Sequence, residues 1–140
     1  MAGFEDSYKE ILKKELKDDF SPAVLEHALN PRNLGRMENA DSYARVTGPC
    51  GDTMEIWLAA DDNKIEQATF ETDGCLTTIA AGSMATEMVK NKKLNEALQI
   101  EQQSILEALG GLPDESEHCA LLAANALRGA LYYLLLNGRI

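Results

Sequence analysis

The sequence predicts a single domain of mixed helices and strands, in which an antiparallel β-hairpin lies between helical segments. Two runs alternate apolar and polar residues with the period of a half-buried strand, and residues 61–64 between them have turn composition. Apolar residues recur at helical spacing before and after these runs. A length of 140 residues and a hydrophobic fraction of 45% suit one domain with a single core.

Two helices are expected before the first strand. Residues 8–16 carry apolar side chains at helical spacing among charges of both signs, which predicts a solvent-exposed helix or a loosely held arm. Ser21 is expected to be an N-cap and Pro22 the first residue of a helix. Residues 22–29 are then expected to form a short amphipathic helix. Residues 32–42 are polar and without periodicity, so they are expected to form a loop.

Three strands follow, at residues 43–47, 54–59 and 65–72. The alternation is clearest in the second run, where apolar residues lie at every other position. The four-residue connection at residues 61–64 predicts that the second and third strands form an antiparallel hairpin.

Helices are expected in the rest of the chain. One begins at Cys75 and is closed by the cations of residues 90–93, and two short helices follow at residues 94–97 and 104–109. The last helix, residues 118–136, has a single charged side chain in its apolar part. Such an apolar helix is expected to be the central helix of the core.

Composition excludes several classes of function. The formal net charge is −10, from 13 basic and 23 acidic residues, which opposes binding to nucleic acid and favours partners with a basic surface. There is no apolar run of the length that spans a bilayer and no secretion signal in residues 1–6, so no membrane and a cytoplasmic location are expected. Three cysteines are an odd number, which suits a disulfide framework poorly.

The three cysteines all lie at predicted ends of elements. Cys50 lies in a Gly- and Pro-containing loop two residues before Asp52, Cys75 begins a helix, and Cys119 follows His118 at the start of another. A fold that gathers these groups at one edge would form a cysteine-rich metal site with two optional non-sulfur ligands. Each residue also has a structural interpretation, because free cysteine is often buried, aspartate suits a turn and histidine suits a helix cap.

The position of Cys75 carries a further chemical expectation. A thiol in the first turn of a helix lies near unpaired amides and the positive end of the helix dipole. Both lower the thiol pKa and favour the thiolate.

Several motifs resemble the IscU / NifU N-terminal family of iron–sulfur cluster assembly scaffolds. They are Asn30-Pro31-Arg32-Asn33, Pro49-Cys50-Gly51-Asp52, Thr72-Asp73-Gly74-Cys75 with Ala80 and Ser83 beyond it, and His118-Cys119. The resemblance runs from about Pro22 to the C-terminus. It implies an α+β fold of the SufE/NifU-like kind, in which a three-stranded antiparallel sheet packs against about five helices. The expected organisation is a helical N-terminal arm at 1–20 and a scaffold domain at 21–140.

The resemblance also implies a function and a site. The chain is expected to be a scaffold, not an enzyme, that accepts sulfur from a cysteine desulfurase, builds a [2Fe-2S] cluster with iron and transfers it to apo-proteins. Cys50, Cys75 and Cys119 are expected at one exposed tip as metal ligands and sulfur acceptors, with Asp52 or His118 as the fourth ligand. Zinc can occupy such a site instead of iron. The sequence leaves open whether the protein acts as a monomer or as a homo-oligomer in which a cluster bridges the subunits.

One segment departs from the family pattern. Members served by a dedicated Hsp70-type chaperone carry Leu-Pro-Pro-Val-Lys before the His-Cys pair, whereas this chain has Leu112-Pro113-Asp114-Glu115-Ser116. The lysine is replaced by Ser116, so the resemblance does not carry that chaperone over as a partner.

Two alternatives to a scaffold remain open. The main one is a zinc-dependent sulfurtransferase like the SufU branch, which accepts persulfide sulfur; the segment between Cys75 and Cys119 lacks that branch's insertion, which favours the scaffold. The other is a zinc-binding domain that only interacts with partners.

Overall fold

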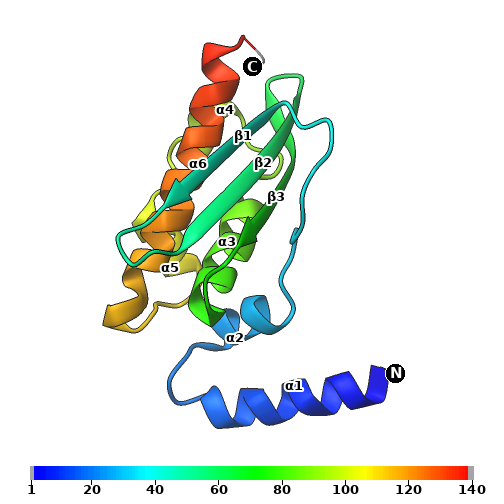
Figure 1. The fold of residues 1–140 in the computed structure, drawn as a ribbon, viewed down its shortest axis with the longest axis vertical. Coiled ribbons are helices and arrows are strands. Elements are labelled where there is room, and N and C mark those ends of the chain that lie inside the picture. Colours follow the sequence, from blue (N-terminus) through cyan, green and yellow to red (C-terminus); the bar gives the residue numbers. More distant parts are fainter. Residues whose placement is uncertain (1, 139–140) are drawn as a thin grey trace.

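The structure is a computed structural model that describes residues 2–138 and the side chains of residues 7–138. Met1 of the predicted arm 1–20 and residues 139–140 of the predicted domain 21–140 lie outside the described residues. In chain order the elements are α1 (Ala2–Leu16), α2 (Pro22–Leu29), β1 (Ser42–Thr47), β2 (Thr53–Asp61), β3 (Lys64–Thr72), α3 (Leu76–Val89), α4 (Leu94–Ala97), α5 (Gln102–Ala108), the 3₁₀ helix η1 (Asp114–Ser116) and α6 (Glu117–Leu136) (Figure 1).

The three strands form one antiparallel sheet in the order β1-β2-β3. Tyr43 pairs with Trp57, and Ile56 pairs with Phe70, so successive residues of each strand alternate between a buried and an outer face. Helices α3 and α6 cover one face, and no helix of residues 2–138 covers the other (Figure 1). The predicted α+β fold with a three-stranded antiparallel sheet is confirmed.

The turn between β2 and β3 is tighter than expected. Strand β2 continues to Asp61 and β3 begins at Lys64, so two residues connect them instead of four. Asp62 and Asn63 both have positive φ angles, of 54° and 65°. Two positive φ values match the right-handed twist of a two-residue hairpin, and Asp and Asn tolerate them better than most residues.

The core lies between the buried face of the sheet and helices α3 and α6. Met54, Ile56 and Phe70 from the sheet are fully buried there, together with Leu127 and Leu131 of α6. Residues 114–136 are long and apolar enough, by length and composition, to cross a membrane, which the sequence analysis did not expect. In the most apolar 18-residue stretch of this segment, 56% is buried inside the protein, as in the core helix of a folded domain.

Part of the loop at residues 32–42 pairs with the sheet edge, contrary to the expectation of a plain loop. The Gly35 amide donates to the Phe70 carbonyl at 2.8 Å, and the Phe70 amide donates to the Asn33 carbonyl at 3.0 Å. Leu34 thereby forms a parallel bridge with Phe70. These contacts use backbone groups only, so no pattern of apolar side chains marks them in the sequence.

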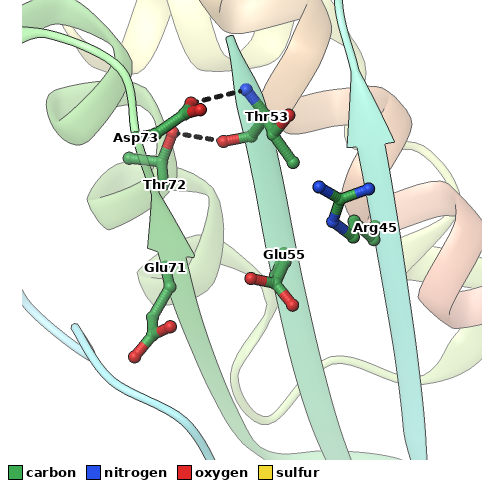
Figure 2. A pocket seen from close by; sticks show the side chains of 6 residues that line it. All are labelled: Arg45, Thr53, Glu55, Glu71, Thr72 and Asp73. Carbon is green, nitrogen blue, oxygen red and sulfur yellow. Dashed lines mark hydrogen bonds between the residues drawn. The ribbon is translucent and has the colours of Figure 1, made fainter.

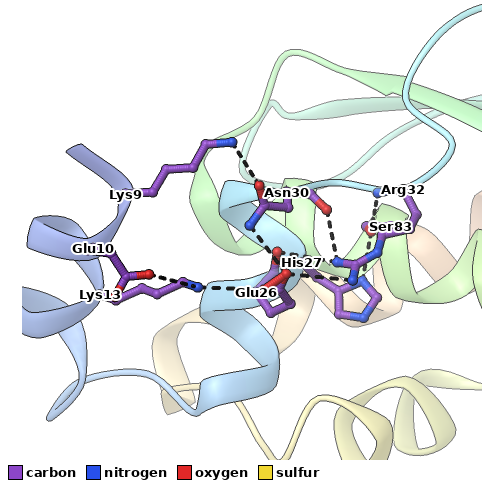
Figure 3. A network of polar contacts seen from close by, with 8 residues as sticks. All are labelled: Lys9, Glu10, Lys13, Glu26, His27, Asn30, Arg32 and Ser83. Atoms are coloured by element: carbon purple, nitrogen blue, oxygen red, sulfur yellow. Dashed lines mark hydrogen bonds and ion pairs between the residues drawn. The ribbon is translucent and has the colours of Figure 1, made fainter. Parts of the chain in front are cut away.

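Helix α1 lies across the end of the molecule next to α2 (Figure 1). Two polar contacts connect it to α2 and the residue after α2, as Figure 3 shows: Lys9 Nζ donates to Asn30 Oδ1 at 2.7 Å, and Lys13 Nζ lies 3.7 Å from Glu26 Oε2. Tyr8 and Ile11 remain more than half exposed. The helix predicted at residues 8–16 is therefore present and held at the surface.

Candidate metal site

Three segments that carry predicted site residues meet at one end of the sheet. They are the β1–β2 turn, the start of α3 and the start of α6 (Figure 1). The turn is closed by two backbone hydrogen bonds, from the Gly48 amide to the Asp52 carbonyl at 2.8 Å and from the Gly51 amide to the Gly48 carbonyl at 3.0 Å. Gly51 has φ of +91°, which favours glycine at this position. This turn presents Cys50 and Asp52.

The connection from β3 to α3 is fixed to the beginning of β2. The Thr53 amide donates to Asp73 Oδ1 at 2.7 Å, and Thr72 Oγ1 donates to the Thr53 carbonyl at 2.6 Å, as Figure 2 shows. These bonds place Cys75, the N-cap residue of α3, next to the turn that carries Asp52. The residues of Figure 2 also line a polar hollow on the outer face of the sheet, which sequence reasoning did not single out.

Two buried threonines in the first turn of α3 connect the candidate ligands. Thr77 Oγ1 lies 3.5 Å from Cys75 Sγ and 3.4 Å from Cys119 Sγ. Thr78 Oγ1 donates to Asp52 Oδ2 at 3.1 Å and lies 3.4 Å from Cys119 Sγ and 4.0 Å from Cys75 Sγ. Residues 52, 75 and 119 are thus brought together through two hydroxyl groups. We call Thr77 and Thr78 the threonine pair.

The start of α6 supplies the remaining two predicted residues. His118 Nε2 lies 3.8 Å from Cys119 Sγ, and Cys119 itself is only 2% exposed. The resemblance implied that all three cysteines lie at an exposed tip. This expectation is wrong for Cys119, which is buried. The first turn of α6 packs against that of α3, so the Cys119 thiol lies beneath the threonine pair and only Cys50 and Cys75 are exposed.

Cys50 is in the same turn as Asp52. The hydroxyls of the threonine pair contact Asp52, Cys75 and Cys119, and the Cys50 thiol does not belong to this group. It is exposed on a turn that contains two glycines and a proline. Among residues 7–138, no group of three or more His, Cys, Asp or Glu side chains is arranged to hold a metal ion. Asp52, Cys75 and Cys119 are thus neighbours through the hydroxyls of the threonine pair, with His118 beside Cys119, and they do not form a ready coordination shell; Cys50 lies at the edge.

The electrostatics of the site favour a reactive thiol at Cys75. The hydrogen bond from the Thr77 hydroxyl lowers the pKa of the Cys75 thiol; partial burial opposes it, and bonds from the Thr77 amide and from Thr78 add to the lowering. A lower pKa increases the fraction of thiolate, which is the form that reacts with sulfur electrophiles and binds metals. The expected lowering at the start of a helix is confirmed in direction, with the neighbouring hydroxyl as its first cause.

The donor set suits soft and borderline metals. Thiolates bind zinc and the iron of iron–sulfur clusters, and a carboxylate or an imidazole can complete the coordination. Sequence reasoning found these donors but missed the threonine pair. The available signal was the position of Thr77 and Thr78 directly after Cys75, because hydroxyls in a first helical turn commonly bond nearby groups.

The segment at residues 112–116 that precedes α6 is short and only partly exposed, since Leu112 belongs to the buried core. Asp114, Glu115 and Ser116 form η1, and both acidic residues are exposed. Ser116, at which the sequence analysis noted a departure from the expected lysine, is the last residue before α6.

The chain resembles known proteins over most of its length. The family model of the NifU-like N-terminal domain matches residues 19–135. The chain is 49% identical over 123 residues to the iron–sulfur cluster assembly scaffold protein IscU 1 of Archaeoglobus fulgidus, covering 86% of this chain and 80% of that protein. It is 40% identical over 117 residues to the scaffold protein IscU of Escherichia coli K12, covering 80% and 91%.

A solved structure supports the fold. The N-terminal part of a nitrogen-fixing NifU-like protein from Brucella abortus superposes with a TM-score of 0.67 at 19% identity, covering 86% of this chain and 97% of that one. Together with the matched family model, these findings establish that the chain belongs to the family of the NifU-like N-terminal domain, which includes the IscU proteins.

Proposed function

We propose that this chain is a scaffold on which iron–sulfur clusters are assembled. The observation that carries the proposal is the meeting of Asp52, Cys75 and Cys119, from three distant segments, around the hydroxyls of the threonine pair. The names of the curated relatives, which describe cluster assembly scaffolds, support it.

In the proposed reaction Cys75 is the first sulfur acceptor. It is exposed and its pKa is lowered, so its thiolate can attack the outer sulfur of a persulfide on a cysteine desulfurase. The new S–S bond forms as the desulfurase thiolate leaves, and Cys75 then carries the sulfane sulfur. Reducing that sulfur to sulfide requires two electrons from an external electron donor. Cys50 and Cys119 are further proposed acceptors.

The assembled [2Fe-2S] cluster is the cargo of the scaffold. We infer that the thiolates of Cys50, Cys75 and Cys119 hold it, with Asp52 or His118 as a fourth, weaker ligand. A mixed set of this kind binds firmly enough for assembly and still permits transfer to an apo-protein. Zinc suits the same donors and is the proposed occupant in the absence of iron.

The proposed partners follow from this chemistry. A cysteine desulfurase supplies sulfur, and apo iron–sulfur proteins receive the cluster. The net charge of −10 leads us to expect a basic contact surface on the desulfurase. Because Ser116 replaces the lysine of the chaperone segment, we do not include an Hsp70-type chaperone among the partners.

Anaerobic incubation with a desulfurase, cysteine, ferrous iron and a thiol reductant tests the proposal. We expect visible absorption from a cluster in the wild-type protein and in Asn125→Ala, a change at an exposed position of α6. We expect none in Cys75→Ala. A colourless protein that retains stoichiometric zinc and accelerates the desulfurase would instead indicate a zinc-dependent sulfurtransferase. Neither absorption nor acceleration would indicate a domain that only interacts with partners.

A further inference from the structure

The threonine pair occupies the space between the candidate ligands. Thr78 is fully buried and Thr77 is 3% exposed, so both hydroxyls must find partners inside the protein. Those partners are the candidate ligands themselves: Asp52 Oδ2 and the sulfur atoms of Cys75 and Cys119. The hydroxyls therefore use the atoms that a metal ion would need.

Thr78 has the central position of the two. Its hydroxyl carries one proton, which it donates to the Asp52 carboxylate at 3.1 Å. Hydrogen bonds to charged groups are stronger than neutral ones, and a buried donor that loses its acceptor carries a cost of its own. A metal ion that binds Asp52 through Oδ2 must first replace this bond.

The backbone around Thr78 is shaped to this side chain. A Cβ atom at Gly74 would lie 2.5 Å from Thr78 Oγ1 and 2.6 Å from Thr78 Cβ. Only glycine at residue 74 leaves Thr78 in its observed position. Substituting Gly74 therefore offers a way to displace Thr78 without removing its hydroxyl.

We propose that Thr78 is a positioning residue that competes with metal for Asp52 and Cys119, so that it weakens metal binding and keeps the site ready to release its cargo. Thr77 contributes less, because it contacts the two sulfur atoms and not the carboxylate. The inference rests on the proposed function for its biological meaning. The competition itself requires only that the site bind a metal ion.

Zinc affinity of the metal-free protein, measured by competition with a chromophoric chelator, tests the competition. We expect Thr78→Val to bind Zn²⁺ about tenfold more tightly than wild type, because the loss of one hydrogen bond to a charged group is worth roughly that factor. Thr78→Ser keeps the hydroxyl and should retain the wild-type affinity. Thr86→Val is the matched control: Thr86 is fully buried in the same helix, and its hydroxyl donates to the Gly82 carbonyl.

A double-mutant cycle separates competition from a general effect on the fold. In an Asp52→Ala background, Thr78→Val should change zinc affinity by less than twofold, because the carboxylate that Thr78 holds is absent. If Thr78→Val does not fold, as judged by circular dichroism, Gly74→Ala, which displaces Thr78 without removing its hydroxyl, provides the same test with the same expected direction.

Three results would overturn the inference. They are an unchanged or weaker zinc affinity in Thr78→Val, an equal gain in Thr86→Val, and the absence of zinc binding in both wild type and Thr78→Val. Failure of the proposed function looks different, because cluster absorption would then be absent while the zinc affinities still followed the predicted order.

Discussion

His27 Nδ1 lies 2.7 Å from the hydroxyl oxygen of Ser83, and the same oxygen accepts the backbone N–H of Arg32 at 2.9 Å. Ser83 is fully buried in α3, so this hydroxyl attaches α2 and the beginning of the following loop to the core (Figure 3). A donor or acceptor left unpaired at such a position is costly. The contact explains physically why a serine stands here in α3.

Ser83→Ala should lower the free energy of unfolding by about 1–3 kcal/mol, because it leaves the Arg32 amide and the His27 ring without their partner. Urea unfolding followed by circular dichroism measures the change. Ser42→Ala is the matched control, since Ser42 is 3% exposed and its hydroxyl has no hydrogen-bond partner among the described residues. Equal effects of the two substitutions would contradict the assigned role of Ser83.

Stability should depend on pH through His27. Burial lowers the pKa of His27 below its ordinary value of 6.5 and the charge of Arg32 lowers it further, while Glu87 and Glu26 oppose the shift. Below pH 6.5 the unfolded chain therefore binds more protons at this residue than the folded one. The free energy of unfolding should fall as the pH decreases from 6.5 through the folded-state pKa, and it should be highest above 6.5.

Urea unfolding of wild type and His27→Gln at a series of pH values checks this dependence. The variant should lose the slope just below pH 6.5. Glu87 does not confuse the result, because its pKa is lowered from 4.5, chiefly by the hydrogen bond from Asn33, and its contribution is lost only at more acidic pH. A slope in His27→Gln as steep as in wild type would show that another group is responsible.

Gly82→Ala should destabilise the protein. A Cβ atom there would lie 2.5 Å from Phe70 Cδ2 and 3.1 Å from Met54 Cε, where α3 crosses the sheet. Overpacking a core costs about 1–3 kcal/mol, which exceeds the roughly 1 kcal/mol gained from replacing glycine within a helix. In Gly129→Ala the new Cβ would have one close neighbour among the described residues, Ala44 Cβ at 3.1 Å, so the effect on the denaturation midpoint should be clearly smaller. The opposite order would refute this packing argument.

Asp52→Ala should lengthen the lifetime of an assembled cluster, because an oxygen ligand exchanges more readily than a thiolate and offers a route for release. The decay of visible absorption in the presence of a chelator measures this lifetime. Asp114→Ala, an exposed carboxylate in η1, serves as the control. A shorter lifetime in Asp52→Ala alone would show that the carboxylate stabilises the cluster.

Patterned elements could be predicted closely, whereas features that depend on backbone contacts could not. The apolar run of α6 and the alternation in β2 identified both elements with nearly correct bounds. The bridge from Leu34 to Phe70 was missed because it rests on main-chain groups. The predicted hairpin turn was too long by two residues. Asp61 and Lys64 have side chains that are common in turns, but the two residues pair with each other at the end of the β-ladder.

At the site, the proximity of Asp52, Cys75 and Cys119 agrees with what the sequence predicted, whereas the burial of Cys119 does not. Cys75 and Asp52 were identified from the thiol and carboxylate themselves and from their places at ends of elements. The burial of Cys119 depends on how the first turns of α3 and α6 pack, which no local pattern encodes. Thr77 and Thr78 acquire their role from the same packing, so they carried little signal in the sequence beyond their proximity to Cys75.

The most direct test of the central claim is the amount of iron and acid-labile sulfide bound to protein purified without oxygen. A scaffold should contain both in equal amounts after assembly, and Cys75→Ala and Cys119→Ala should contain neither. Wild-type protein that holds no sulfide under these conditions, or variants that hold as much as wild type, would contradict the account.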